Sequence, residues 1–196
     1  MSLYFQKILF IINKYNNPKK KHINKGDNML YYFKVLIVYS FLGFIYESDI
    51  FKISSSSKHS GILFGPLTLV YGFGCLLLLL ENKYLFSKIK LNKYLKLPLI
   101  YIIITISLSL IEWIGGQTLN LIFGIDMWNY SNHHFHLGKY LCLFNSLIWS
   151  LFGLIFIYIL HPRLNKIITN ITTKETHLIL IIFIIDIAIT LLTKLT

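Results

Sequence analysis

The chain has 196 residues, of which 55% are hydrophobic and only 14% are charged, and its mean hydropathy is +0.62. Soluble domains average about 45–50% apolar and about 25% charged residues, so this chain has more apolar surface than one core could shield from water. The composition excludes an ordinary soluble enzyme and a disordered chain. The net charge of +11 does not indicate nucleic-acid binding, because the lysines lie between long apolar runs and form no single basic face.

The first 28 residues are basic and precede the apolar runs. Their apolar stretch, Ile8–Ile12, is too short for a signal-peptide core and the bases follow it, so we expect no cleavable signal here. Met29 lies just before the first apolar run, so one interpretation makes it the natural start and residues 1–28 dispensable. The alternative is a basic arm that lies on anionic lipid. Residues 29–196 then form the transmembrane domain.

Five apolar segments have the length, or nearly the length, of the roughly 20 residues that a transmembrane helix needs. They are Leu30–Tyr46, Ile62–Leu80, Leu99–Ile122, Leu141–Leu160 and Leu178–Leu195. The sequence therefore predicts an all-α fold, a polytopic transmembrane bundle of about five spans in the plasma membrane. Between the second and third spans, the basic and aromatic stretch Glu81–Pro98 is expected to hold a short interfacial helix that ends where Pro98 restarts the chain. Thr172 and Glu175 have the spacing of a capping box at the start of the last helix.

Basic residues are distributed unevenly between the two sides of these spans. With the N-terminus inside, 15 lysines and arginines lie on the inner side and 4 on the outer side. Because inner loops of membrane proteins are enriched in basic residues, we predict an N-inside, C-outside topology.

Polar residues follow one face of three predicted helices. Ser40, Gly43 and Glu47 are spaced by three and four residues, and so are the sets Gly61, Gly65, Thr68, Gly72 and Thr105, Ser109, Glu112, Gly116, Asn120. Close helix packing explains the small residues, but it does not require a carboxylate, which is costly in a bilayer. Counting 1.5 Å per residue places Glu47 and Glu112, together with Gly65–Pro66 and Asn145, toward the outer leaflet. We expect a polar site there, with a shared proton or a bound cation between the two glutamates. Asp186, near the middle of the last span, is expected to bond to a neighbouring helix.

The loop from Gly124 to Tyr140 is the other concentration of polar residues. His133, His134, His136 and Asp126 could bind a metal such as zinc, but their spacing lacks a helical pair of histidines. We favour no metal and no cofactor, and interpret the loop as an interfacial one anchored by Trp128 and Tyr130. No phosphate-binding loop, serine elbow, kinase motif or dinucleotide fingerprint occurs, so we do not expect this chain to be an ATPase.

Several short pieces occur together in a fixed order. They are Gly43–Ser48, Gly61–Pro66, Tyr71–Gly74, Ile111–Trp113, Trp128–Ser131, Phe135, Leu137, Cys142–Leu143, Trp149 and His161–Pro162. Their order resembles a family of small bacterial membrane proteins, the putative ABC transporter type IV family. The resemblance covers about residues 38–164. It implies a permease-like fold and role, and it completes the set of candidate substrate or ion site residues: Glu47, Gly65, Pro66, Tyr71, Glu112, Trp128, Tyr130 and Asn145.

The chain departs from the family pattern at four places. Ser60 replaces a basic residue, Thr68–Leu69 replaces Cys-Pro, Asn129 replaces Asp, and Gly138–Tyr140 replaces an Asn-Gly-Arg run. If those polar residues carry the family's activity, this copy is altered or inactive.

Three functions fit the sequence. The first is a permease-like component that acts with a separate ATPase subunit or with copies of itself, because five spans are few for a complete pathway. The second is a membrane-embedded enzyme acting on a lipid-linked substrate, with the glutamates and histidines as acid–base or metal groups. The third is a non-catalytic assembly or regulatory subunit.

Overall fold

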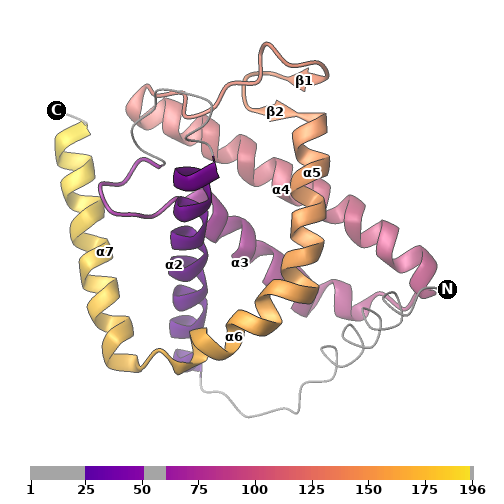
Figure 1. The fold of residues 1–196 in the computed structure, drawn as a ribbon, viewed down its shortest axis with the longest axis horizontal. Coiled ribbons are helices and arrows are strands. Elements are labelled where there is room, and N and C mark those ends of the chain that lie inside the picture. Colours follow the sequence, from indigo (N-terminus) through magenta and orange to yellow (C-terminus); the bar gives the residue numbers. More distant parts are fainter. Residues whose placement is uncertain (1–24, 51–60, 195–196) are drawn as a thin grey trace.

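The computed structural model describes residues 25–50 and 61–194 and is built of helices (Figure 1). The longer elements are α2 (Lys25–Ile50), α3 (Leu69–Tyr84), α4 (Lys93–Phe123), α5 (Leu143–Ile155), α6 (His161–Asn170) and α7 (Thr173–Lys194). Five stretches are long and apolar enough to cross a membrane: Asn28–Ser48, Leu69–Lys88, Tyr94–Phe123, Leu143–Asn170 and Thr173–Lys194. The predicted all-α bundle with five spans is therefore confirmed. Most of the basic segment 1–28 lies outside the described residues.

The core lies where α2, α3 and α4 meet the bend between α5 and α6. Its buried side chains include Val35 and Tyr39 of α2, Leu78 of α3, Ile104 of α4 and Ile157. Small residues allow the close approach that packing in a bilayer requires. Gly72 of α3, for example, lies directly against Ser40 and Leu36 of α2, and a methyl group in its place would collide with both.

Helix α7 lies at the edge of the bundle, beside α2 at the left of Figure 1. Its side chains Leu178, Ile181, Ile185 and Leu192 are exposed. Such exposure is expected of a helix that faces hydrocarbon and not water, since lipid tails are as apolar as leucine.

The second span begins later than the sequence predicts. We expected Ile62–Leu80, whereas α3 begins at Leu69 and residues 61–68 are not helical. Gly61 has a φ of 104°, which L side chains rarely adopt, and Pro66 has no backbone N–H to donate. With 16 residues, α3 alone is roughly 24 Å long, and the turn that follows it extends the stretch to the 20 residues of Leu69–Lys88.

The predicted interfacial helix between the second and third spans is wrong. A single 3₁₀ turn, η2 (Phe86–Lys88), occupies its place and buries Phe86. Helix α4 then begins at Lys93, where the Asn92 side chain accepts a hydrogen bond from the Tyr94 amide. Pro98 therefore lies inside α4 and does not precede it, as membrane helices tolerate more readily than soluble ones.

The fourth span continues past its predicted end at Leu160. After α5, the π-helical turn η3 (Phe156–Leu160) leads directly into α6, and the helix changes direction between them (Figure 1). A π turn followed by Pro162 is a recognised cause of such a kink.

The last span begins as predicted. The Thr172 amide donates to Glu175 Oε2 over 2.7 Å, and the Glu175 amide donates to the Thr172 hydroxyl over 3.3 Å. This reciprocal pair is a capping box, which satisfies two backbone donors at the start of α7.

Candidate functional site

Tyr130, in the loop before α5, bonds to the intramembrane Glu112. Its hydroxyl donates to Glu112 Oε1 over 2.8 Å. The loop is held in this position by backbone bonds from the Tyr130 amide to the Lys139 carbonyl and from the His133 amide to the Tyr130 carbonyl. Burial, and then the adjacent Glu112, raise the pKa of Tyr130 above its ordinary value. The phenol therefore stays protonated and remains a donor at physiological pH.

Glu47, at the end of α2, bonds to the first turn of α3. The Thr68 hydroxyl approaches Glu47 Oε2 at 3.5 Å, and the Tyr71 side chain also forms a hydrogen bond with this carboxylate. The Tyr71 ring packs directly on Gly43, one turn before Glu47, where a methyl group would collide with it. The small-residue face of α2 thus lets an aromatic donor reach the glutamate.

The two glutamate–tyrosine pairs lie within electrostatic range of each other, and we call them, together with Asn145, the polar cluster. Tyr71 and Tyr130 are close enough to interact electrostatically, and Tyr130 also forms a side-chain hydrogen bond with Asn145 of α5. The cluster of Glu47, Tyr71, Glu112, Tyr130 and Asn145 therefore draws on α2, α3, α4, the outer loop and α5. The bonds found here place a tyrosine on each carboxylate, and the shared proton or bound cation between the two glutamates stays a prediction.

Aromatic rings line one side of this cluster. The Trp149 ring of α5 lies 5.5 Å from the Tyr71 ring and 6.0 Å from the Tyr46 ring, both edge to face. The sequence interpretation did not include Trp149 or Thr68 among the site residues. Trp149 lies one turn after Asn145 on the same helix, which is the signal that could have indicated it.

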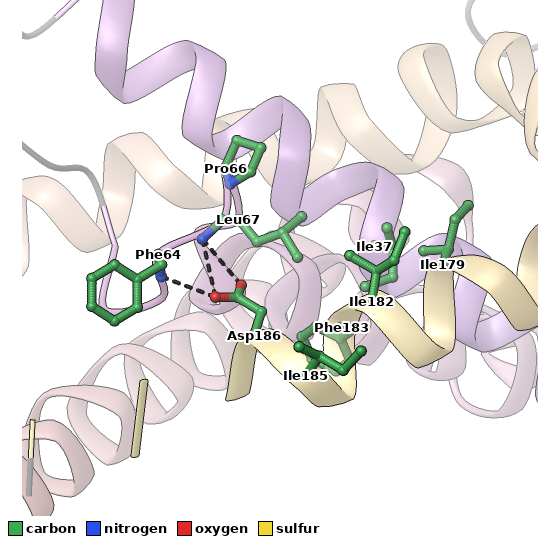
Figure 2. Close-up of a pocket in the computed structure, with 10 residues that line it drawn as sticks. Ile37, Phe64, Pro66, Leu67, Ile179, Ile182, Phe183, Ile185 and Asp186 are labelled. Atoms are coloured by element: carbon green, nitrogen blue, oxygen red, sulfur yellow. Dashed lines mark hydrogen bonds between the residues drawn. The ribbon is translucent and has the colours of Figure 1, made fainter. Parts of the chain in front are cut away.

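Gly65 and Pro66 lie elsewhere than predicted. We expected them to form the wall of the glutamate site, but the Gly65 amide donates to both oxygens of Asp186 in α7, each over 3.1 Å, and the Phe64 amide donates to Asp186 Oδ1 (Figure 2). Asp186 thus bonds to the backbone of a non-helical segment, and not to a neighbouring helix as predicted. These residues border an apolar cavity of about 440 Å³ between α2 and α7.

Trp128, in the outer loop, packs against α4. Its ring lies beside Gly115, where an added Cβ atom would be 3.6 Å away, and its centroid is 6.3 Å from that of the Tyr140 ring. Its indole nitrogen is buried and has no hydrogen-bond partner. No described contact joins Trp128 to either glutamate, so of the eight predicted residues five converge, and Gly65, Pro66 and Trp128 lie around them.

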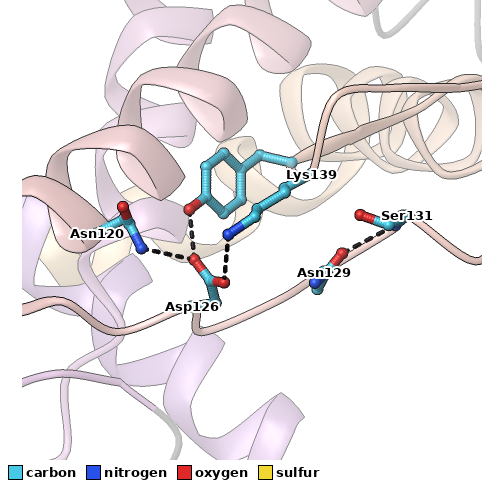
Figure 3. Close-up of polar contacts among 6 residues, drawn as sticks. Asn120, Asp126, Asn129, Ser131 and Lys139 are labelled. Atoms are coloured by element: carbon cyan, nitrogen blue, oxygen red, sulfur yellow. Dashed lines mark hydrogen bonds and ion pairs between the residues drawn. The ribbon is translucent and has the colours of Figure 1, made fainter.

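The polar loop is organised around Asp126 (Figure 3). This carboxylate accepts hydrogen bonds from Asn120 over 2.9 Å and from Tyr140, and forms an ion pair with Lys139 at 3.0 Å. The Tyr140 bond, followed by the Lys139 bond, holds the pKa of Asp126 below its ordinary value, and the Asp126 bond raises the pKa of Tyr140 to about 12. The loop ends in a short antiparallel hairpin, β1 (His136–Leu137) and β2 (Leu141–Cys142).

The histidines of the loop are not arranged as a metal site. His133 packs edge to face on Tyr130, and His136 Nδ1 lies 3.0 Å from the Gly138 carbonyl. Within residues 25–50 and 61–194, no three His, Cys, Asp or Glu side chains gather closely enough to hold a metal ion. The alternative in which Asp126 and the three histidines bind zinc has no support from this geometry.

A second buried polar group lies in the opposite half of the bundle. His161, 1% exposed, lies between the hydroxyls of Tyr39 at 2.9 Å and Tyr31 at 3.2 Å, and Tyr31 donates to Asn165. The Tyr31 hydroxyl donates its hydrogen to Asn165, so it must accept a hydrogen bond from His161 Nε2. His161 Nδ1 then carries no hydrogen and accepts from the Tyr39 hydroxyl. The group ties α2 to α6 just after the kink.

The comparison with known proteins agrees with this architecture. A family model described as "Putative ABC-transporter type IV" matches residues 34–193. The chain belongs to this family. The match includes the glutamates, both tyrosines and Asp186, so the whole polar cluster lies within the family's domain. No curated protein and no solved structure matches the chain.

Proposed function

We propose that this protein is a permease-like component of an ABC-type transport system in the plasma membrane. The observation that carries the proposal is the convergence of Glu47–Tyr71 and Glu112–Tyr130 from separate helices of a transmembrane bundle. Ionisable side chains in membrane helices mark substrate and ion pathways more often than they serve packing alone. The family match supports a transport role.

The groups of the polar cluster are suited to bind transported solutes that carry hydrogen-bond donors or a positive charge. Two carboxylates, two phenols and one amide supply acceptors, and the Tyr46 and Trp149 rings supply faces that attract positive charge. Glu47 and Glu112 are the residues that would bind the cargo or a coupling ion, with Tyr71, Tyr130 and Asn145 orienting them. Trp128 would support the outer loop that carries Tyr130.

The energy source must come from elsewhere, since the chain has no phosphate-binding loop. We propose a separate ATPase subunit and assembly into a homo- or hetero-oligomer, because five spans are few for a complete pathway.

Two measurements test the proposal. The full-length protein is purified gently from its native membranes, and we expect a nucleotide-hydrolysing subunit to co-purify with it. In a deletion strain complemented with Glu47→Gln or Glu112→Gln, we expect the same altered solute content as in the deletion itself, at unchanged membrane level of the protein.

Glu81→Gln is the matched control. Glu81 is also a glutamate of a membrane helix, but it bonds to Ser107, away from the cluster. Its variant should restore the solute content. Absence of any ATPase partner, with full complementation by both cluster variants, would instead favour a non-catalytic assembly subunit.

A further inference from the structure

The non-helical residues 61–68 descend into the bundle along α7. The Ile62 carbonyl accepts from Lys194 Nζ at the end of α7, whereas the Phe64 and Gly65 amides donate to Asp186. Asp186 precedes Lys194 by eight residues, which is roughly 12 Å along a helix. Three residues further on, the Thr68 amide donates to the Ser40 carbonyl of α2 over 3.0 Å, and α3 begins there. The segment is thus the non-helical first part of the second span, and it leads directly into α3.

Asp186 offsets the main energetic cost of placing non-helical backbone within the membrane. Non-helical backbone at membrane depth leaves N–H groups without partners, each at a cost of several kcal/mol. The Asp186 carboxylate accepts from two of these groups (Figure 2). The fit is close, since a Cβ atom on Gly65 would lie 2.6 Å from Asp186 Oδ2. The carboxylate of α7 can approach the backbone this closely because residue 65 is a glycine.

The same segment ends at the polar cluster. Thr68 is its last residue, and its hydroxyl lies 3.5 Å from Glu47 Oε2. Tyr71, one turn into α3, bonds to the same carboxylate. The position of the segment along α7 therefore determines the position of the first turn of α3 relative to Glu47.

We propose that Asp186 is a positioning residue for the polar cluster, acting through the non-helical segment 61–68 and without touching cargo. This inference rests on the proposed function for the role of the polar cluster, but the effect of Asp186 on the segment can be tested without a transport measurement. If α7 shifts relative to α2, the segment moves with Asp186, and Thr68 and Tyr71 change position relative to Glu47.

The test compares amide hydrogen exchange of the full chain in lipid nanodiscs for Asp186→Leu and the parent. We expect exchange to rise about tenfold or more at Phe64 and Gly65, which lose their acceptor, and also at Thr68 and Tyr71, which Asp186 does not contact. Amides in α5 should remain unchanged. Asp186→Asn, which keeps one acceptor oxygen, should restore part of the protection.

An independent signal is the infrared absorption of the Glu47 carboxyl group, identified by its loss in Glu47→Gln. We expect this band to shift in Asp186→Leu, because the Thr68 and Tyr71 bonds change. Thr190→Val, a substitution of another buried polar side chain of α7, should leave both exchange and the band as in the parent.

The proposal is overturned if exchange rises only at Phe64 and Gly65 while the Glu47 band stays in place, because Asp186 would then serve its two donors alone. It is also overturned if α5 exchanges faster as well, which would indicate general loosening. If Asp186→Leu does not accumulate, Gly65→Ala displaces the carboxylate from the other side and must give the same pattern. Failure of the transport experiments would leave these outcomes unaffected.

Discussion

The Tyr130 hydroxyl donates to Glu112 over 2.8 Å and so joins the outer loop to a carboxylate within the third span. The bond does two things at once. It satisfies a carboxylate that the bilayer disfavours, and it positions a polar loop over the ends of the helices.

Removing this donor should destabilise the protein. We expect Tyr130→Phe to lower the free energy of unfolding by about 1–3 kcal/mol, because a half-buried carboxylate loses a hydrogen-bond partner. Denaturant unfolding in micelles measures the change. Tyr101→Phe is the control, since it removes an exposed bond to the Leu147 carbonyl and should cost less. Additive losses in the double variant Glu112→Gln/Tyr130→Phe would show that the two side chains are not coupled.

Two adjacent glycines of α4 should differ in their tolerance of a methyl group. A Cβ atom at Gly116 would lie 2.5 Å from the Tyr140 ring, whereas one at Gly115 would meet the Trp128 ring at 3.6 Å, an ordinary contact. We expect Gly116→Ala to cost about 1–3 kcal/mol by overpacking and Gly115→Ala to be neutral or slightly stabilising. Thermal unfolding of both variants under the same conditions decides this. Equal losses would mean that Tyr140 does not rest on Gly116.

The outer loop should lose order in acid. The pKa of Asp126 is lowered by its bonds to Tyr140 and Lys139, so the folded loop prefers the ionised carboxylate. The stabilisation is therefore present above the ordinary aspartate pKa of 3.8 and is lost as the pH falls through the lower value of the folded state. Amide exchange of residues 124–142, measured from pH 7 down to pH 2 and corrected for the intrinsic pH dependence of exchange, follows the transition. In Asp126→Asn the acid step should be absent. A step that persists in that variant would assign it to another group.

The orientation of the bundle remains a prediction from charge. The basic residues Lys83, Lys88, Lys90 and Lys96 lie at the connection between α3 and α4, and the β1–β2 hairpin lies at the opposite end of α4. We expect a reporter fused after Thr196 to be active outside the cell and one fused after Ile89 to be active inside. The reverse pattern would invert the assignment of the polar cluster to the outer leaflet.

Much of the fold can be predicted from sequence because the relevant signals are local. Apolar length defined the spans, and Thr172 and Glu175 marked the start of α7 by their spacing. The boundaries that were wrong depend on distant partners. Residues 61–68 are apolar enough for a helix but are not helical, and Asp186, more than a hundred residues away, accepts the amide hydrogens of Phe64 and Gly65.

The candidate site divides in the same way. The sequence by itself determined a membrane protein with five spans, an uneven distribution of lysines and two glutamates whose burial calls for partners. Only the tertiary structure decided which partners those are: Tyr71 and Thr68 for Glu47, Tyr130 for Glu112, and Asp186 for Gly65. The reason is physical. Helices such as α4 and α7 are apolar on nearly every side, because lipid and protein interior are equally apolar, so the hydrophobic pattern does not reveal which face meets which neighbour. Close contacts at glycines and hydrogen bonds between distant segments determine that instead.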